Sequence, residues 1–378
     1  MAVTSTTDPH DRRILELVMR GEATSRSALA AELGVAASTV GLRVQRLLDA
    51  DLLREEGVAA SRGGRPARIL RVNDGGGAIL TVDLGGSHAR VGRHALSGAL
   101  QQAISVPVSL PDGPERTLEI VGRALAEAAG ERTIRAIGVS LPGPVDIGKG
   151  AVKLPSRMPG WPNFRVGRAL SARFGVPVVV DNDANLAALG EHLHHFGTSH
   201  HSITVKAGTA IGSGIIVDGR IHRGASFAAG DISHTRIDRA ADVPCSCGNT
   251  GCLETVASGA GLVRQLRSQG VEVETTAEVL ALAHDADPRA TRVVRDAGRL
   301  LGEVLSGVVN FFNPHAVFLT GSMSASEPFL AAVRSRVYEG CHPLVTRKLR
   351  IEAARTGPDA ILFGAARLVL DEVPFSAA

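Results

Sequence analysis

The sequence is poor in cysteine and has no long apolar run. Its four cysteines are too few to build a disulfide framework in a chain of 378 residues. No stretch approaches the ~18 to 20 apolar residues that a membrane-spanning helix requires, and residues 1–12 contain no apolar run. We therefore expect a cytoplasmic protein that does not interact with a membrane.

The formal net charge is also small. A value of +3 does not by itself indicate a nucleic-acid partner, because such a partner responds to a localised positive field and not to the total charge. The length allows two or three domains, each with its own apolar core. The distribution of residue types along the chain is therefore more informative than the totals.

Residues 1–72 are predicted to form a winged helix-turn-helix domain. Apolar residues recur at helical spacing in Pro9–Met19 and again in Ser27–Leu33, after which Gly34 can end the second helix. Ser38 could cap a third helix. The apolar stripe of that helix would be Val40, Val44, Leu47 and Leu48.

A basic, glycine-rich hairpin follows these helices. Residues 57–72 contain four arginines and no acidic residue, so the hairpin can act as a wing that contacts phosphates or the minor groove. The candidate DNA contacts are Arg62 and Arg65 in the wing and Ser38, Thr39 and Arg43 in the third helix. The alternative is a protein-interaction module with a solvated basic hairpin, which is the weaker hypothesis because the helices occur together with this wing.

The rest of the chain is predicted to be an α/β domain with two similar halves, because apolar strands alternate with helical stretches. The strand Ile79–Asp83 leads into the glycine-rich residues 85–87, and the strand Ile203–Val205 leads in the same way into residues 208–214. The expected boundaries are 1–72 for the DNA-binding domain, 73–77 for a linker, 78–180 for a small lobe and 181–378 for a large lobe.

Both glycine-rich turns have the character of phosphate-binding loops. The candidate residues are Asp83, Gly85, Gly86, Gly208 and Thr209, of which Asp83 could hold Mg2+ through water. Ala210 stands where a third glycine would let the backbone approach a phosphate most closely. We therefore interpret the loops as vestigial and do not expect ATP or Mg2+ as cofactors.

Three of the four cysteines are clustered. Cys245, Cys247 and Cys252 lie within eight residues, and His234 lies eleven residues upstream of the first. Three thiolates and one imidazole with no open position are typical of structural Zn2+. The alternative is three buried or redox-active thiols without a metal, and Cys341 is expected to be an ordinary buried thiol.

A polar segment at the end of an apolar strand offers candidate ligand-binding groups. Asp183 could act as a general base toward a hydroxyl and Asn182 could orient that hydroxyl, although either residue could simply cap a helix. Zinc would fix a loop that presents Asp231, His234 and Glu254 toward the same ligand. The ring nitrogen of His234 that does not bind zinc could then bond a sugar hydroxyl.

Together these residues resemble the ROK family, in particular its repressor branch. The most specific element is the Gly230–His234 segment followed by Cys245-x-Cys247-Gly248-x-x-Gly251-Cys252-x-Glu254. Further similarity lies in residues 141–146, 161–163, 182–185 and 190–191 and in the wing residues 63–66.

The resemblance implies an actin-like, duplicated ribonuclease-H-like fold of the sugar-kinase type, with a C-terminal helix that could return to the small lobe. It implies a sugar site between the lobes, formed by Asn182, Asp183, Asp231, His234 and Glu254, with Asp183 as the phosphotransfer base in a kinase. This chain departs from the family pattern at Ser87, His88, Ala210, Asp231, Ser233 and the segment 319–322.

From these features we expect a sugar-responsive, DNA-binding transcriptional regulator of carbohydrate metabolism genes, and we expect it to act as a repressor. We also expect structural zinc and no kinase activity. The expected partners are an operator DNA, a sugar or sugar-derivative effector and further copies of the chain in a homodimer or homotetramer. Two alternatives remain open at this point: an active ATP-dependent sugar kinase with an accessory DNA-binding domain, and a repressor controlled by a protein partner.

Overall fold

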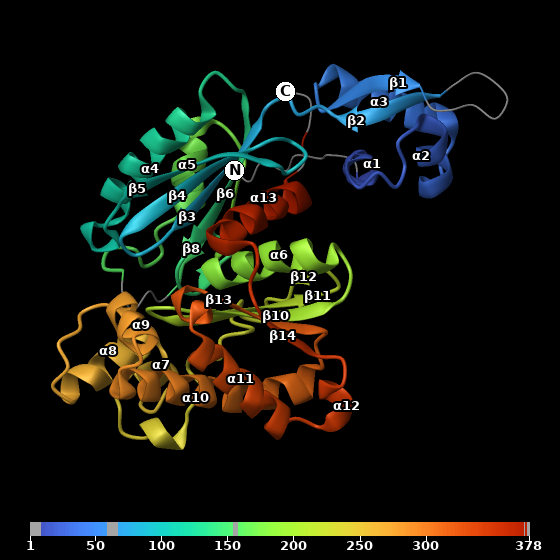
Figure 1. Cartoon of the computed structure of the whole chain (residues 1–378). Coiled ribbons are helices and arrows are strands. Elements are labelled where there is room, and N and C mark those ends of the chain that lie inside the picture. The colour runs from blue at the N-terminus through green and yellow to red at the C-terminus, as the bar shows by residue number, and fades with distance from the viewer. Residues whose placement is uncertain (1–8, 59–66, 154–157, 374, 376–378) are drawn as a thin grey trace.

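The computed structural model describes residues 9–58, 67–153, 158–373 and 375 (Figure 1). The expected wing contacts Arg62 and Arg65 lie outside the described residues. In the described part no single helix has the length and apolar character that crossing a bilayer requires. Helices α2 and α3 pass that test only when they are joined across their 119° bend.

The N-terminal domain consists of three helices and a two-stranded antiparallel hairpin: α1 (Pro9–Met19), α2 (Arg26–Leu33), α3 (Ala37–Asp49), β1 (Leu53–Val58) and β2 (Arg68–Val72). The hydroxyl of Ser25 caps α2 by accepting the N–H of Ala28, and Gly34 ends that helix in the left-handed conformation. Ile14, Leu29, Val40, Val44 and Leu70 are fully buried among the elements. This is the winged helix-turn-helix arrangement that the sequence predicts.

The first half of the α/β domain is a five-stranded sheet in the order β5-β4-β3-β6-β9. Strands β3, β4 and β5 form an antiparallel meander, whereas β6 and β9 are parallel to β3. The elements are β3 (Ala78–Leu84), β4 (His88–His94), β5 (Leu100–Pro107), η1 (Leu110–Asp112), α4 (Pro114–Ala129), β6 (Ile134–Leu141), β7 (Val145–Asp146), β8 (Ala151–Val152), α5 (Val166–Phe174) and β9 (Val178–Asn182).

The second half repeats this topology with the order β12-β11-β10-β13-β14. Its elements are α6 (Asp183–Phe196), β10 (His201–Ala207), β11 (Ile211–Val217), β12 (Arg220–Ile221), η2 (Asp238–Ala240), α7 (Glu254–Ala257), α8 (Gly259–Ser268), α9 (Thr276–His284), α10 (Pro288–Phe312), β13 (Ala316–Thr320), η3 (Ser322–Ala325), α11 (Glu327–Gly340), α12 (Pro343–Thr346), β14 (Arg350–Ala353), η4 (Gly357–Asp359) and α13 (Ala360–Glu372). Again three strands form an antiparallel meander and two are parallel to the first. The repeated strand order confirms the predicted duplicated fold.

Two helices connect the halves by crossing each other between the sheets (Figure 1). Helix α6 follows β9 of the first sheet but packs on β10 and β11 of the second, and α13, which follows the second sheet, packs on β3 and β6 of the first. A Cβ atom on Gly364 would lie 1.9 Å from the carbonyl oxygen of Leu186, and one on Gly190 would lie 2.0 Å from that of Ala360. Only glycine therefore fits at these two positions.

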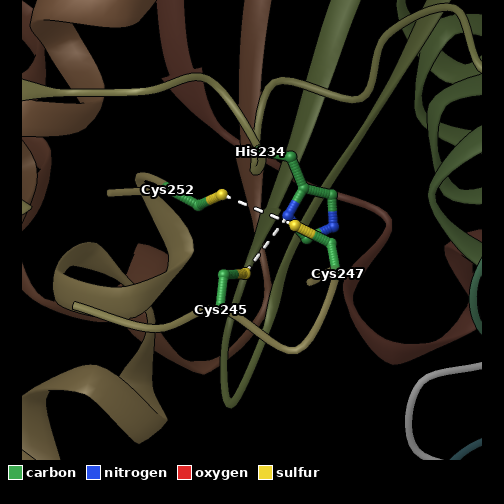
Figure 2. A group of neighbouring side chains, drawn as sticks. All are labelled: His234, Cys245, Cys247 and Cys252. Atoms are coloured by element: carbon green, nitrogen blue, oxygen red, sulfur yellow. Dashed lines mark hydrogen bonds between the residues drawn. The ribbon is translucent and has the colours of Figure 1, made fainter. Parts of the chain in front are cut away.

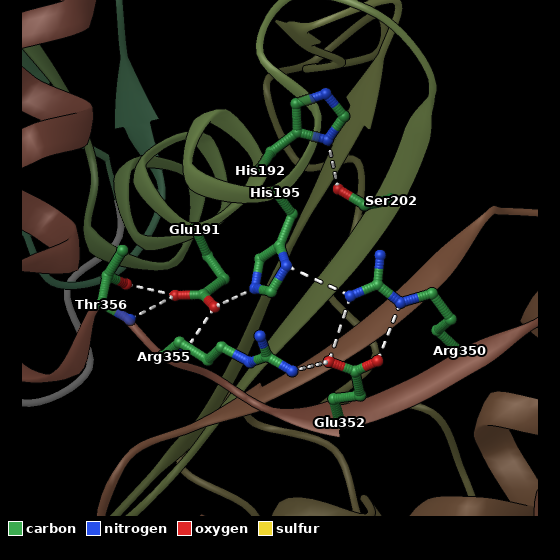
Figure 3. A network of polar contacts seen from close by, with 8 residues as sticks. All are labelled: Glu191, His192, His195, Ser202, Arg350, Glu352, Arg355 and Thr356. Carbon is green, nitrogen blue, oxygen red and sulfur yellow. Dashed lines mark hydrogen bonds and ion pairs between the residues drawn. The ribbon is translucent and has the colours of Figure 1, made fainter.

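A buried carboxylate fastens the segment before α13 to α6 (Figure 3). Glu191 accepts hydrogen bonds from the backbone N–H groups of Arg355 (2.7 Å) and Thr356 (3.0 Å), and from the Thr356 hydroxyl. His195 Nε2 lies 2.9 Å from the same carboxylate. Burial raises the pKa of Glu191, but these hydrogen bonds outweigh it and hold that pKa below its ordinary value.

The N-terminal domain is closely joined to the first half. Arg135 donates from Nε to the carbonyl of Gly76 (2.8 Å) and from its terminal nitrogen to the carbonyl of Ala50 (3.0 Å). A Cβ atom on Gly76 would lie 1.8 Å from the carbonyl oxygen of Asp51. One buried apolar cluster includes Leu52 and Leu70 of the N-terminal domain and Ile79, Leu96, Val369 and Val373 of the α/β domain. The connecting residues 73–77 are thus packed against both domains.

We expect Gly364→Ala to lower the free energy of unfolding by about 2 to 3 kcal/mol, because the added methyl group forces α6 and α13 apart. Gly307→Ala is the matched control, since Gly307 lies within α10 and a Cβ atom added there would have no neighbour within 4 Å. The control should be neutral or stabilising by up to about 1 kcal/mol. Urea unfolding measures both variants, and equal stability of Gly364→Ala and the wild type would contradict the close crossing.

We expect Glu191→Gln to destabilise the protein by about 2 kcal/mol at pH 7, because an amide cannot accept all the hydrogen bonds made to the carboxylate. The folded-state pKa of Glu191 lies below its ordinary value of 4.5, so its stabilisation is present above that value and is lost as the pH falls. The stability difference from the wild type should therefore narrow in urea titrations below about pH 4.5. Glu303→Gln, at a side chain that is 61% exposed, should show no such difference at any pH.

Candidate functional site

The N-terminus of α6 carries Asn182 and Asp183. The Oδ1 atom of Asn182 accepts the N–H groups of Ala184 (2.9 Å) and Asn185 (3.2 Å), so its side chain caps the helix. Its Nδ2 atom donates to the carbonyl of Gly143 (2.8 Å) and to Asp183 (3.1 Å). Of the two roles that the sequence left open for Asn182, capping is the one seen in the structure.

Asp183 is held by a lysine that sequence reasoning missed. One carboxylate oxygen of Asp183 accepts the N–H of Ala184 (2.9 Å), and the other lies 2.6 Å from Nζ of Lys206. Lys206 projects from β10, and its side chain is 36% exposed. The signal in the sequence is a single lysine in the otherwise uncharged stretch Ile203–Gly208, directly before the second glycine-rich turn.

A second carboxylate, from the first sheet, interacts electrostatically with the same ammonium. Asp83, at the end of β3, accepts a hydrogen bond from the hydroxyl of Ser140 (3.1 Å). Burial raises the pKa of Asp83, the positive charge of Lys206 lowers it, and the charge of Asp183 raises it again, with a net upward shift. Asp83, Asp183 and Lys206 therefore form one group of interacting charges drawn from both halves of the domain.

The two glycine-rich turns connect antiparallel strands. Residues 85–87 join β3 to β4, and residues 208–210 join β10 to β11. The carbonyls of Gly208 and Thr209 accept the N–H groups of Gly259 (2.7 Å) and Ala260 (3.1 Å). A Cβ atom on Gly214 would lie 2.7 Å from the carbonyl oxygen of Ala184, so this glycine allows α6 to pack on β11.

The predicted ligand residues Asp231 and Glu254 are connected through Ser233. The carboxylate of Asp231 accepts the Ser233 hydroxyl (2.6 Å), and the backbone N–H of Glu254 donates to the Ser233 carbonyl (2.9 Å). The buried carboxylate of Glu254 accepts the N–H of Ile211 on β11 (3.4 Å). The hydroxyl of Ser213, also on β11, donates to the carbonyl of Gly230. Strand β11 therefore lies between this loop and the start of α6.

His234, Cys245, Cys247 and Cys252 come together as predicted from the sequence (Figure 2). All four ligand atoms lie within 4.8 Å of one another. The Nδ1 atom of His234 is 3.5 Å from Sγ of Cys245, and Sγ of Cys247 is 3.7 Å from Sγ of Cys252. Nδ1 of His234 faces the thiols, so Nε2 is the nitrogen available to another partner.

The backbone of the cysteine loop brings the thiols together. The N–H of Cys245 donates to the carbonyl of Asn249 (2.8 Å), and Gly248 adopts a φ of 93°, which a residue with a side chain rarely adopts. A backbone N–H at Asn249 lowers the pKa of the Cys247 thiol and so favours the thiolate, which is the form that binds a metal. The cluster therefore has both the donors and the geometry of a four-coordinate metal site.

Helix α3 differs in detail from the sequence prediction. It begins at Ala37, and Ala36 is the N-cap residue without a side-chain hydrogen bond, so the prediction that Ser38 caps the helix is wrong. Ser38 lies in the first turn with an exposed side chain, and Thr39 is half-buried. Arg43 pairs with Asp11 of α1 (3.0 Å), and its side chain is only 13% exposed.

The position of Arg43 argues against its expected role as a base contact. Arg43 lies next to the buried Val44, at the edge of the apolar stripe, and its ion pair with Asp11 joins α3 to α1. The exposed face of α3 instead carries Ser38, Leu42 and Gln45, and Leu42 is 72% exposed. These three residues are spaced i, i+4, i+7, which places them on one face of a helix, so the sequence alone could have predicted this exposed face.

The fold and site define a class: a helix-turn-helix domain joined to a two-lobed α/β domain of the sugar-kinase type that carries a four-residue His–Cys cluster able to hold a metal. The chain belongs to the ROK family, because the model described as "ROK family" matches residues 79–372. A model described as "Helix-turn-helix domain" matches residues 6–56.

Regulators and kinases are both among the similar proteins. A putative xylose repressor from a Caldicellulosiruptor species is 30% identical over 95% of this chain and 95% of its own length. The crystal structure of a ROK family transcriptional regulator, a homologue of the Escherichia coli MLC protein, covers 97% of this chain and 96% of its own at 28% identity and a TM-score of 0.82. A ROK family glucokinase from Streptomyces griseus, solved with glucose and AMPPNP, covers 77% of this chain and 99% of its own at 27% identity and a TM-score of 0.68.

Proposed function

We propose that this chain is a sugar-responsive transcriptional repressor that binds operator DNA through its N-terminal domain. The observation that carries the proposal is the extent of similarity: the match to the solved ROK regulator covers 97% of the chain and so includes the helix-turn-helix domain. The similar glucokinase covers 77% of the chain. The shared apolar cluster of Leu52, Leu70, Leu96 and Val373 supports the proposal that a change caused by sugar binding in the α/β domain is transmitted to the N-terminal domain.

The proposed sugar site consists of Asn182, Asp183, Asp231, His234 and Glu254. Carboxylates and an imidazole nitrogen are suitable partners for sugar hydroxyls. Hydrogen bonds through Ser233 hold Asp231 and Glu254 in fixed relation to each other. By likeness to the glucokinase, which was solved with glucose, we place the effector beside β11, which contacts both this loop and the start of α6.

The proposed metal at His234, Cys245, Cys247 and Cys252 is structural Zn2+. With Zn–S bonds of ~2.3 Å and Zn–N bonds of ~2.0–2.1 Å, a tetrahedral ion separates two sulfurs by ~3.8 Å and a sulfur from a nitrogen by ~3.6 Å. The distances of 3.7 Å and 3.5 Å between Sγ atoms and between Sγ and Nδ1 agree with these values. Zinc would fix the loop and leave Nε2 of His234 for a sugar hydroxyl.

For DNA recognition we propose that Ser38 and Leu42 face the major groove. Exposed Ser38 can bond a base edge, and the exposed Leu42 side chain can contact a thymine methyl group. Thr39 and the wing residues Arg62 and Arg65 stay in the proposal as further DNA contacts. A homodimer or homotetramer in the cytoplasm would present paired helices to a two-fold operator.

Kinase activity is the second candidate function, because Asp183 is present and the chain is similar to a glucokinase. The ion pair of Asp183 with Lys206 argues against it. We propose that the chain does not transfer phosphate and does not require ATP or Mg2+.

The function is tested by selecting bound duplexes from a random DNA library, and then measuring anisotropy of a selected duplex with a panel of monosaccharides and amino sugars. We expect a selected sequence and at least one sugar that changes its affinity. Asp231→Asn should leave DNA affinity unchanged and raise the sugar concentration for half response at least about tenfold, since a charge-assisted hydrogen bond is lost. Asp218→Asn, at a 79% exposed side chain, is the control and should respond like the wild type. Failure to select any sequence, or no effect of any sugar, would contradict the proposal.

For the metal, we expect one zinc per chain by elemental analysis after dialysis. Cys247→Ser should lose most of this zinc and lower the melting temperature, because the metal ties the loop together. Cys341→Ser is the control, since this buried cysteine lies outside the cluster and should keep its zinc. Unchanged zinc content in Cys247→Ser would remove this assignment.

A further inference from the structure

The side chain of Lys206 occupies the part of the site where a kinase of this fold would carry out its chemistry. Its ammonium lies 2.6 Å from one carboxylate oxygen of Asp183. The other oxygen of Asp183 accepts the N–H of Ala184 (2.9 Å) and the amide of Asn182 (3.1 Å). Both oxygens of Asp183 thus accept hydrogen bonds within the protein, and the oxygen that a general base would use is paired with the Lys206 ammonium, although its second lone pair can still accept a sugar hydroxyl.

Lys206 also interacts with the carboxylate that a metal would need. Asp83 stands at the end of β3, directly before the turn at residues 85–87, and its charge is coupled to both Lys206 and Asp183. The other groups that act on Asp83 are the hydroxyl of Ser140 and the side chain of His88. A fixed positive charge therefore already offsets part of the negative charge of the two carboxylates.

Phosphoryl transfer from a nucleotide depends on a divalent cation that bridges the phosphates and is held by carboxylate oxygens or water. A Mg2+ ion near Asp83 and Asp183 would meet the Lys206 ammonium and be repelled by it. An anionic ligand is disfavoured as well, because Lys206 is already paired and two carboxylates stand beside it. An uncharged sugar, which bonds through hydroxyl groups, has neither difficulty.

We propose that Lys206 is a specificity-determining residue that closes the site to Mg2+–nucleotide by holding Asp183 in an ion pair opposite Asp83, and so restricts the effector to an uncharged sugar. This inference rests on the proposed function, since it concerns the ligand of the same site. The sequence of the two glycine-rich loops suggests that nucleotide binding is lost, and this proposal makes the side chain of Lys206 the cause of that loss.

The test compares the wild type with Lys206→Met and Lys206→Gln, with Mg2+–AMPPNP binding followed by calorimetry and Mn2+ binding followed by electron paramagnetic resonance. Both variants should bind Mg2+–AMPPNP and Mn2+ at least tenfold more tightly than the wild type. Lys348→Met is the control, because this exposed lysine lies in the segment before β14, and it should behave like the wild type. Melting curves identify any variant that is not folded, and the two replacements differ in polarity so that one folded variant suffices.

Two results would overturn the proposal. One is wild-type protein that binds Mg2+–AMPPNP as tightly as a folded Lys206 variant does. The other is a sugar phosphate or sugar acid that binds the wild type at least tenfold more tightly than its uncharged parent sugar. The nucleotide measurement needs neither DNA nor a sugar, so its outcome is separate from the sugar-dependent DNA binding that tests the proposed function.

Discussion

The close crossing of α6 and α13 is the constraint on which the arrangement of the molecule depends. Each helix starts beyond one sheet and packs on the other, so their contact sets the angle between the two halves. At Gly190 and Gly364 the backbones approach so closely that a single methyl group would collide with a carbonyl oxygen. Because each helix packs on a different half, the halves can change their angle only if the two helices move relative to each other at this tight contact.

The same helices connect the site to the N-terminal domain. Asn182 and Asp183 stand at the start of α6, and α13 ends at Glu372, next to the apolar cluster that includes Val373. Arg223 strengthens this link by pairing with Asp181 (2.7 Å), the residue before Asn182, and with Glu372 (3.0 Å). A ligand that favoured one position of α6 would therefore act, through the contact of α6 with α13, on the element that reaches the N-terminal domain. Such an effect requires different affinities for the two arrangements.

The sequence predicted those features whose cause is local. The spacing of three cysteines on a glycine-containing loop was enough to predict that they and His234 lie together, and two similar strand–glycine patterns were enough to predict a duplicated domain. Contacts between distant residues could not be predicted in this way. Arg43 was expected to face DNA, but its partner Asp11 lies 32 residues away, and the partner of Asp183, Lys206 on β10, lies 23 residues away. Spacing along the chain does not reveal which opposite charges meet.

The glycines of β11 show why a motif and its function can separate. Gly214 is required because α6 packs directly on the strand, and this requirement is the same whether or not a phosphate binds at the adjacent turn. The presence of Gly214 is therefore weak evidence for nucleotide binding in this chain. A charged residue is more informative, because it changes which ligand the site can accept without changing how the helix packs. Lys206 is such a residue: it leaves the strand pairing of β10 with β11 and β13 intact and alters the charge that faces Asp183.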